Sequence, residues 1–371
     1  MNMLISVIYY AFWVAFGIQL MYMFAIYFRS FLYKENLQVN TFNAPVSIII
    51  CARNAAKNLE ENLPKYLEQH YHEYEVVVVN DRSWDNTASL LEKFEEKFKN
   101  IKVVTVPESE HNPFAGKKFA KTMGVKAAKY EHLLFADADC VPSSDNWLYE
   151  MCKEFENSDL VIGLSPLKGG KGFWAYISRF DTLLIAYNYF SYALAKMPYM
   201  AVGRNMAYTK QLFFDVKGFK SHYTLPSGDD DLFVRDVLGK AKISVSASSD
   251  GLTYSYPKSN FNDWIRQKKR HFLTAPKYRF INKALLGLYS VSYLIFLMSF
   301  IFLLISGKID WFILGAFLFR IFIFTLFAYK VFKILGETKQ LFLLPFMECI
   351  LFFTNGLIYY SNTISKPNKW S

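Results

Sequence analysis

The fold is decided by the stretch His132-Leu133-Leu134-Phe135-Ala136-Asp137-Ala138-Asp139-Cys140, an apolar run that ends in two carboxylates one residue apart. Alternation along a strand puts Asp137 and Asp139 on the same side of its carboxyl end, where open α/β sheets bind ligands. Two such carboxylates repel unless a cation or a donor lies between them. The pair predicts a site for Mg²⁺ or Mn²⁺, held by one carboxylate and substrate phosphates. The alternative is a polar turn after a buried strand.

Three further apolar runs predict strands of the same sheet, because continuous Val- and Ile-rich runs are typical of strands buried on both faces. They are Val46–Cys51, Glu75–Val79 and Ile101–Val106. Predicted helices separate them: Lys57–Leu67, a charged helix that ends near Lys99, and Gly116–Lys129. This alternation predicts an α/β fold with a mostly parallel sheet and right-handed crossovers. Asn54, Asp81 and Asp139 would then follow strand ends at one edge of the sheet.

Both ends of the 371-residue chain are strongly apolar, and they raise its hydrophobic fraction to 53%. Met3–Phe28 is uncharged and lacks the basic segment and cleavage site of a signal peptide, which predicts an uncleaved transmembrane helix over residues 1–30. Three more transmembrane helices are predicted within residues 284–362, at Ala284–Ser306, Trp311–Tyr329 and Leu341–Tyr360. We therefore expect an integral membrane protein.

Lysines and arginines lie after the first predicted span, before the second, and between the third and fourth. By the positive-inside rule, residues 45–280 form a cytoplasmic domain at a plasma or inner membrane. The net charge of +10 fits a domain that rests on an anionic leaflet and binds a polyphosphate. The basic residues do not form a nucleic-acid reading module, which argues against such a partner. The four cysteines form no CxxC pair, so they suit a reducing compartment and predict no zinc site.

Two charges interrupt the apolar C-terminal segments, Arg320 in the third predicted span and Glu348 in the fourth. Because these spans run in opposite directions, both charges would lie at a similar depth from the cytoplasmic end. Charges inside a membrane usually pair or line a polar path. We expect an ion pair between Arg320 and Glu348; the alternative is that Arg320 holds a lipid phosphate.

Seven segments, in this order, resemble the membrane-bound family 2 glycosyltransferases with a GT-A catalytic domain, a nucleotide-diphospho-sugar transferase fold. The flanking spans resemble those of polysaccharide synthases and ceramide glucosyltransferases. The resemblance covers about residues 45–275, well over half of the chain. The segments are Ala52-Arg53-Asn54, Asn80-Asp81-Arg82-Ser83, Gly116-Lys117, Asp137-Ala138-Asp139, Gly203-Arg204-Asn205, Gly228-Asp229-Asp230-Asp231 and Gln267-Lys268-Lys269-Arg270-His271.

The resemblance implies a donor site for a nucleotide-sugar. It implies that Asp81 binds the uracil or ribose and that Asp139 is the metal ligand. The other implied donor-binding residues are Arg53, Asn54, Lys117, Asp137 and Gly203. For Asp81 the alternative is a helix N-cap, where Asp is favoured. We expect Lys118 and Lys121 to be solvated charges on the outer face of their helix.

Three adjacent aspartates, Asp229 to Asp231, precede an apolar run and could mark a helix start, where negative charge is favourable. In the family, a carboxylate at this place is the general base that deprotonates the acceptor hydroxyl. Alignment on the preceding small residue favours Asp230, which we choose as the base, whereas alignment on the following Leu-Phe favours Asp231. Clustered acids have raised pKa values, which suits a base that works near neutral pH.

The segment Gln267 to His271 resembles the QxxRW motif and implies that Gln267, Arg270 and His271 line the donor site, with Arg270 on the diphosphate. His271 stands where the motif has tryptophan, which leaves the acceptor preference open. We expect Lys268 and its basic neighbours to form a juxtamembrane basic cluster.

Residues 172–197 are rich in aromatic side chains, and they predict either an amphipathic helix in the membrane interface or a core helix of the domain.

Together these features predict an inverting, metal-dependent glycosyltransferase. It would move a sugar from a nucleotide-sugar, with UDP favoured, to a hydroxyl presented at the membrane by a lipid or a lipid-linked glycan. One alternative is a processive polysaccharide synthase subunit. Another is a catalytically silent membrane scaffold, against which the acidic centres argue. The sequence leaves the oligomeric state open.

Overall fold

A seven-stranded sheet forms the centre of the globular part of the protein, seen in a computed structural model that describes residues 3–35, 42–107 and 116–364. Its strand order is β3-β2-β1-β4-β7-β6-β8, and every strand except β7 runs in the same direction. This confirms the predicted mostly parallel sheet. The strands are β1 (Val46–Ala52), β2 (Tyr74–Asp81), β3 (Ile101–Val106), β4 (His132–Asp137), β6 (Leu160–Gly163), β7 (Met206–Thr209) and β8 (Ile243–Ser246).

Helices cover both faces of this sheet, which is why its central strands are apolar throughout. Alternate residues of β1 face opposite layers: Ile48 and Ile50 pack under α3, α4 and α6, whereas Ile49 packs under α5 and α7. The helix bounds are α3 (Ala56–Leu67), α4 (Thr87–Lys97), α5 (Lys117–Ala127), α6 (Trp147–Cys152), α7 (Phe173–Leu194), α8 (Lys210–Asp215) and α9 (Asp231–Val237). A separate two-stranded ladder pairs β5 (Val141–Pro142) with β9 (Thr253–Tyr254).

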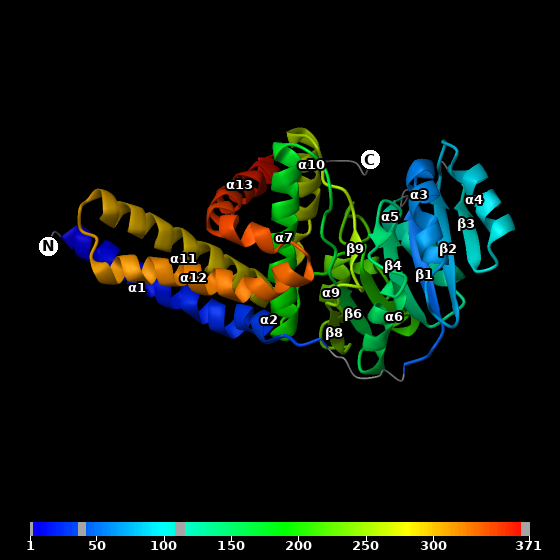
Figure 1. Cartoon of the computed structure of the whole chain (residues 1–371), viewed down its shortest axis with the longest axis horizontal. Helices are drawn as coiled ribbons and strands as arrows, with labels where there is room; N and C mark the ends of the chain where they lie inside the picture. The colour runs from blue at the N-terminus through cyan, green and yellow to red at the C-terminus, as the bar shows by residue number, and fades with distance from the viewer. Residues whose placement is uncertain (1–2, 36–41, 108–115, 365–371) are drawn as a thin grey trace.

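Four helical segments are long and apolar enough to cross a membrane: Met3–Leu32, Phe280–Ile305, Trp311–Ile334 and Thr338–Asn362. They contain α1 (Met3–Tyr22) with its continuation α2 (Phe28–Leu32), α11 (Phe280–Ile305), α12 (Trp311–Ile334) and most of α13 (Leu344–Ile364). In Figure 1, α1, α11 and α12 lie alongside one another and point away from the sheet, while α13 turns toward α10 (Phe261–Phe272). These segments match the four predicted spans.

The helix α7 stands between the sheet and the apolar helices (Figure 1), where it contacts β8 on one side and α2, α12 and α13 on the other. More than half of its residues are buried, among them Phe180, Tyr187 and Phe190. A buried ion pair joins Asp181 on α7 to Lys268 on α10, with 2.7 Å between Lys268 Nζ and Asp181 Oδ1. The enclosed helix fits the core-helix alternative, and contact of its remaining surface with lipid stays a prediction.

The structure confirms the predicted ion pair between Arg320 of α12 and Glu348 of α13, with 2.6 Å between Arg320 Nη2 and Glu348 Oε1. Arg320 Nη2 also donates to Gln19 Oε1 at 2.9 Å, and the Tyr289 hydroxyl donates to Glu348 Oε1 at 2.9 Å. One network therefore joins α1, α11, α12 and α13. Arg320 is only 2% exposed, and a side chain so enclosed by protein does not fit the alternative role of holding a lipid phosphate.

We expect Arg320→Gln and Glu348→Gln each to lower the thermal stability of the detergent-solubilised protein. Each change leaves one charge buried without a partner, at a cost of about 3–5 kcal/mol. The double variant should be more stable than the sum of the two losses predicts, because it removes both charges together. Melting curves of the four proteins test this, and additive losses would contradict the coupling.

Candidate active site

The loops that follow β1 and β2 are fastened to one another at the carboxyl edge of the sheet. Asn54 adopts a left-handed conformation with φ of 50°, which asparagine tolerates better than most residues. Its backbone N–H donates to Ser83 Oγ at 3.0 Å, and its side-chain Oδ1 accepts from the Trp84 N–H at 3.0 Å. The Arg53 guanidinium lies 5.3 Å from the centre of the Trp84 ring, which is 76% exposed. The two loops therefore present a cation and an open aromatic face.

Asp81 ends β2 and is only 1% exposed. Arg82 Nε donates to its Oδ1 at 2.8 Å, whereas Oδ2 is buried and has no hydrogen-bond partner among the described residues. Burial of a carboxylate oxygen without a hydrogen-bond donor costs free energy. We therefore expect a bound molecule to donate an N–H or O–H group to Asp81 Oδ2. Asp81 lies within β2 and is not an N-cap, because the N-cap position of the next helix, α4, is Asn86. The N-cap alternative is therefore wrong.

Asp137 and Asp139 lie close together, but strand alternation is not the reason. β4 ends at Asp137, and a turn follows in which the Cys140 N–H donates to the Asp137 carbonyl at 3.0 Å. This turn, and not the pleat of a strand, brings one ligand atom from each of Asp137, Asp139 and Cys140 to within 4.8 Å of one another. Asp139 is exposed, and its Oδ2 accepts a long hydrogen bond of 3.4 Å from Ser255 Oγ.

Two lysines of α5, Lys117 and Lys121, neutralise carboxylates that arrive from other elements. Lys117 Nζ lies 2.6 Å from Asp137 Oδ1 and 3.7 Å from Asp229 Oδ2, and Lys121 Nζ lies 2.5 Å from the same Asp229 oxygen. Burial alone would lower the pKa of Lys117, but Asp137 and Asp229 outweigh it and raise that pKa above its ordinary value. Burial would likewise raise the pKa of Asp229, but Lys121 and Lys117 hold it well below its usual range.

The prediction that Lys118 and Lys121 are solvated charges is wrong, since they are 5% and 1% exposed. Lys118 Nζ donates to the carbonyl oxygens of His222 at 2.6 Å and Leu225 at 3.0 Å, and so anchors the loop that leads to α9. Burial lowers the pKa of Lys118 to about 8. The partners of both lysines lie about a hundred residues further along the chain, so the local pattern of charges gave no sign of them.

Gly203 packs directly on this cluster. Its N–H donates to Asp230 Oδ2 at 3.0 Å, and a Cβ built on it would lie 2.9 Å from Lys121 Nζ. A side chain at this position would make the end of the Lys121 side chain shift, so the glycine allows a close fit to the cluster. Gly203 therefore supports the acidic loop, and whether it also contacts a donor sugar stays a prediction.

The three adjacent aspartates have different surroundings. Asp230 caps α9, with Oδ1 accepting from the Asp231 N–H at 2.8 Å, and it is the most exposed of the three. Asp231 is buried and accepts a 2.8 Å hydrogen bond from the Tyr278 hydroxyl. Burial, with the negative charge of Asp230, raises the pKa of Asp231 to about 7. The helix-start alternative is thus correct for the backbone, because α9 begins at Asp231. It does not exclude a catalytic role for an aspartate of this group.

The helix α10 carries Gln267, Arg270 and His271 at positions that share one helical face. It is fixed to the acidic loop, because the Ser227 hydroxyl donates to the Arg270 carbonyl at 3.0 Å. His271 has an exposed surface, but partial desolvation, with the positive charges of Arg270 and Lys268, lowers its pKa to about 3, so its imidazole is neutral at physiological pH. Within the described ranges no carboxylate lies at ion-pairing distance from the Arg270 guanidinium.

The same helix corrects a second expectation about lysines. Lys268, predicted to belong to a solvated basic cluster, is 5% exposed and forms the buried pair with Asp181. Trp264, one turn earlier on the same face, is 2% exposed, so this face of α10 packs into the protein and not onto lipid headgroups.

The residues around Asp139 fit a hard divalent ion. Carboxylate oxygens are the ligands that Mg²⁺ and Mn²⁺ prefer. Of the three possible ligands, Asp139 is the most accessible. It is exposed, whereas Asp137 is paired with Lys117. Burial raises the pKa of the Cys140 thiol well above its ordinary value, and sulfur is a poorer ligand than a carboxylate oxygen for such a hard ion. Such an ion would therefore need further oxygen ligands from a bound molecule.

Models of known protein families match this chain over most of its globular part and beyond. One described as Glycosyl transferase family 2 matches residues 47–214, and one described as Glycosyl transferase family group 2 matches residues 132–353. A poly-beta-1,6-N-acetyl-D-glucosamine synthase from Staphylococcus epidermidis is 31% identical over 131 residues, 35% of this chain and 29% of that protein. One from Staphylococcus aureus is 28% identical over 124 residues, 33% of this chain and 28% of that protein. The matches thus span under a third of these curated relatives.

A solved structure shares the fold over nearly its whole length. The mannosyltransferase PcManGT from Pyrobaculum calidifontis, in complex with GDP-Man and Mn²⁺, superposes with a TM-score of 0.57 at 18% identity, covering 91% of this chain and 99% of that one. This likeness confirms the predicted GT-A fold with apolar helices attached. The second family model covers more than half of the chain, and the sheet edge it spans carries the acidic centres described above. The chain therefore belongs to glycosyltransferase family 2.

Proposed function

We propose that this protein transfers a sugar, with inversion, from a nucleotide-sugar to a hydroxyl group of an acceptor presented at the membrane. The observation that carries the proposal is the convergence of Asp81, Lys117, Asp139 and Asp230 at one edge of the sheet. Each lies at the end of a different element, and each offers chemistry for one part of the reaction. The named curated relatives, which are polysaccharide synthases, support the same class of reaction.

The nucleoside would bind over the ends of β1 and β2. The buried Asp81 Oδ2 lacks a donor among the described residues, and the N–H edge of a nucleobase supplies one. Uracil has a single ring N–H between two carbonyl groups, which suits one carboxylate acceptor, so we favour UDP over GDP. The exposed Trp84 ring and the Arg53 guanidinium offer flat surfaces for stacking on the base.

The diphosphate would lie between α5 and α10. Lys117 and Arg270 provide positive charge there, and a planar guanidinium suits phosphate oxygens. Asp139 would hold a divalent ion that bridges the phosphates and stabilises the negative charge of the leaving group. Gln267 and His271 share the α10 face with Arg270 and would line the same part of the cleft.

Asp230 is our proposed general base. Asp229 is neutralised by Lys121, and Asp231 is enclosed beneath Tyr278, so Asp230 has the carboxylate with the best access to an acceptor hydroxyl. It would take the hydroxyl proton while that oxygen attacks the anomeric carbon from the face opposite the departing diphosphate. A base on one face and a leaving group on the other produce inversion.

We propose that the domain lies on the cytoplasmic side and that the acceptor is a lipid or lipid-linked glycan. The basic residues beside the apolar helices support this orientation. The position of α10, between the acidic loop and α13, supports an acceptor that approaches from the membrane side. A processive synthase remains the second candidate, favoured by the names of the curated relatives.

The donor site predicts a specific pattern of ligand stabilisation. UDP with Mn²⁺ should raise the melting temperature of the detergent-solubilised protein, and GDP should raise it less. Asp139→Asn should remove the part of the shift that depends on Mn²⁺, because the ion loses its protein ligand. Asp81→Asn should weaken UDP binding with and without metal.

Asp215→Asn serves as the matched control, since Asp215 is an exposed aspartate on α8. Its response to UDP should equal that of the wild type. A folded wild-type protein that shows no shift with any nucleotide would instead favour the catalytically silent scaffold.

Asp230→Asn should abolish sugar transfer and also UDP-sugar hydrolysis, while UDP binding stays within about twofold of wild type. The amide keeps the shape, and its oxygen can still cap α9, but it loses the hydrogen bond from the Gly203 N–H and cannot accept a proton. Asp231→Asn should keep a measurable rate, because the Asp231 carboxylate is buried. The opposite ranking of the two variants would assign the base to Asp231.

The raised pKa of Asp231 predicts a pH-dependent stability. Between the ordinary aspartate pKa of about 4 and the folded value of about 7, the folded protein binds a proton that the unfolded chain does not. Stability contributed by this group therefore falls as pH rises through this window. Asp231→Asn should flatten the decline in melting temperature between pH 5 and pH 8, relative to wild type and to exposed Asp145→Asn. An unchanged decline would contradict the assignment.

A further inference from the structure

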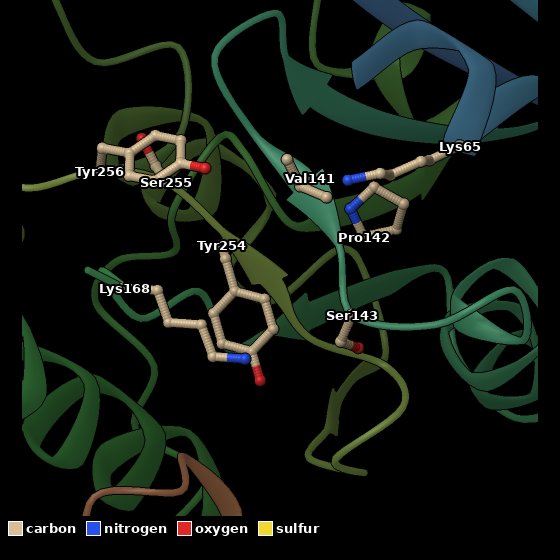
Figure 2. Close-up of a pocket in the computed structure, with 8 residues that line it drawn as sticks. All are labelled: Lys65, Val141, Pro142, Ser143, Lys168, Tyr254, Ser255 and Tyr256. Atoms are coloured by element: carbon tan, nitrogen blue, oxygen red, sulfur yellow. The ribbon is translucent and has the colours of Figure 1, made fainter. Parts of the chain in front are cut away.

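A half-open cavity of about 290 Å³ lies beside the turn that carries Asp139. Figure 2 shows its walls, which come from four parts of the chain: the end of α3, the strand β5, the strand β9 and the loop before α7. The lining residues are Lys65, Val141, Pro142, Ser143, Lys168, Tyr254, Ser255 and Tyr256.

The walls of this cavity are held by backbone pairing. Val141 of β5 pairs with Tyr254 of β9, and the Ser143 N–H donates to the Leu252 carbonyl at 2.8 Å. The Lys168 N–H donates to the Ser255 carbonyl at 2.8 Å, which fastens the loop before α7 to the same strand. The cavity is therefore part of the fixed structure of the domain.

The cavity adjoins the candidate transfer site. Val141 follows Asp139 by two residues, and Ser255 contributes to the cavity wall while its hydroxyl donates to Asp139 Oδ2. The nucleoside surface formed by Arg53, Trp84 and Asp81 follows β1 and β2 of the large sheet, whereas the cavity lies against the separate β5–β9 ladder, and none of these three residues lines it. A molecule in the cavity would thus sit next to Asp139 without competing for the nucleoside surface.

The cavity is positively charged. Lys65 and Lys168 reach toward it from opposite sides (Figure 2), and none of its lining residues is acidic. In the part of the chain that the structure describes, neither ammonium group has a carboxylate at ion-pairing distance. The Lys168 Nζ lies 3.6 Å from the centre of the Tyr254 ring. This cation–π contact keeps the ammonium group at the rim of the cavity. Two cations without acidic partners favour an anionic ligand.

Flat apolar surfaces complete the lining. Tyr256 is 66% exposed, and with Pro142 it offers the kind of face on which the C–H side of a sugar ring packs. Ser143 and Ser255 supply hydroxyl groups for hydrogen bonds. The volume lies at the lower end of the range for small-molecule sites, which suits a single sugar unit.

We propose that this cavity is an acceptor subsite for a saccharide unit that carries a phosphate or a carboxylate. The inference rests on the proposed function, since it specifies the acceptor of that reaction. The negative group would lie between Lys65 and Lys168, and the sugar ring would pack on Tyr256. The shared chemistry has two sources, an acidic sugar within a glycan or the sugar phosphate that links a glycan to a lipid.

Ligand-observed NMR on the full chain in detergent tests this, with glucose 1-phosphate, glucuronate and neutral glucose as probes and with UDP and diamagnetic Mg²⁺ present to fill the donor site. Wild type should bind at least one anionic probe more tightly than glucose, and high salt should weaken that binding. Lys65→Gln and Lys168→Gln should each weaken it about fivefold. The exposed Lys93→Gln on α4 is the matched control and should leave it unchanged.

The ratio between the two anionic probes distinguishes the sources: tighter binding of glucose 1-phosphate indicates a lipid-linked sugar phosphate, and tighter binding of glucuronate indicates an acidic glycan. Equal binding of all three probes, or anion binding unchanged in both lysine variants, would overturn the proposal. UDP titration of the same preparations keeps the two hypotheses separate. Normal UDP binding with no anion preference rejects only the subsite, whereas absent UDP binding rejects the proposed function.

Discussion

Two lysines one turn apart on α5 hold the candidate site together. Lys117 and Lys121 meet Asp137 from the end of β4 and Asp229 from the loop before α9, so charges from three elements neutralise one another. Without these lysines, two enclosed carboxylates would repel each other and pay the cost of burial. Gly203 packs closely against this cluster, where a Cβ would lie 2.9 Å from Lys121 Nζ. Lys117 and Lys121 pair with Asp137 and Asp229, which lie next to Asp139 and Asp230 in the chain. The two lysines therefore help to fix the relative positions of Asp139 and Asp230.

Buried ion pairs also join helices where the domain meets the apolar helices. The Lys268–Asp181 pair fixes α10 to α7, and the Arg320–Glu348 pair joins α12 to α13. α10 carries Arg270 and His271, and its pairing with α7 fixes where these two residues lie. The apolar helices and the candidate site are therefore joined through helices that buried ion pairs hold together.

The sheet, and the gathering of polar residues at its carboxyl edge, could be predicted from sequence because both depend on local patterns. Apolar runs such as Val46–Ala52 have few alternatives to a buried strand, and polar residues after such runs must gather at one edge. The Arg320–Glu348 pair was predictable because two charges in apolar helices have few other partners. In each case the physical constraint lies within a short stretch of chain.

What escaped prediction depends on distant partners or on turns. Lys118, Lys121 and Lys268 have the spacing of surface lysines, and only the folded chain supplies the carbonyl and carboxylate groups that permit their burial. The turn at Asp139 replaces a predicted strand, since a hydrogen bond to the Asp137 carbonyl closes it. In the sequence, Trp84 has the pattern of an ordinary turn residue. Only the folded structure places Asn54 and Arg53 beside it.

A structure of the protein with UDP and Mn²⁺, determined in a lipid nanodisc, tests the central claim most directly. The account predicts a nucleobase N–H on Asp81 Oδ2, the metal ion on Asp139, and a diphosphate within reach of Lys117 and Arg270. UDP bound away from these residues, or a metal ion held without Asp139, would contradict it.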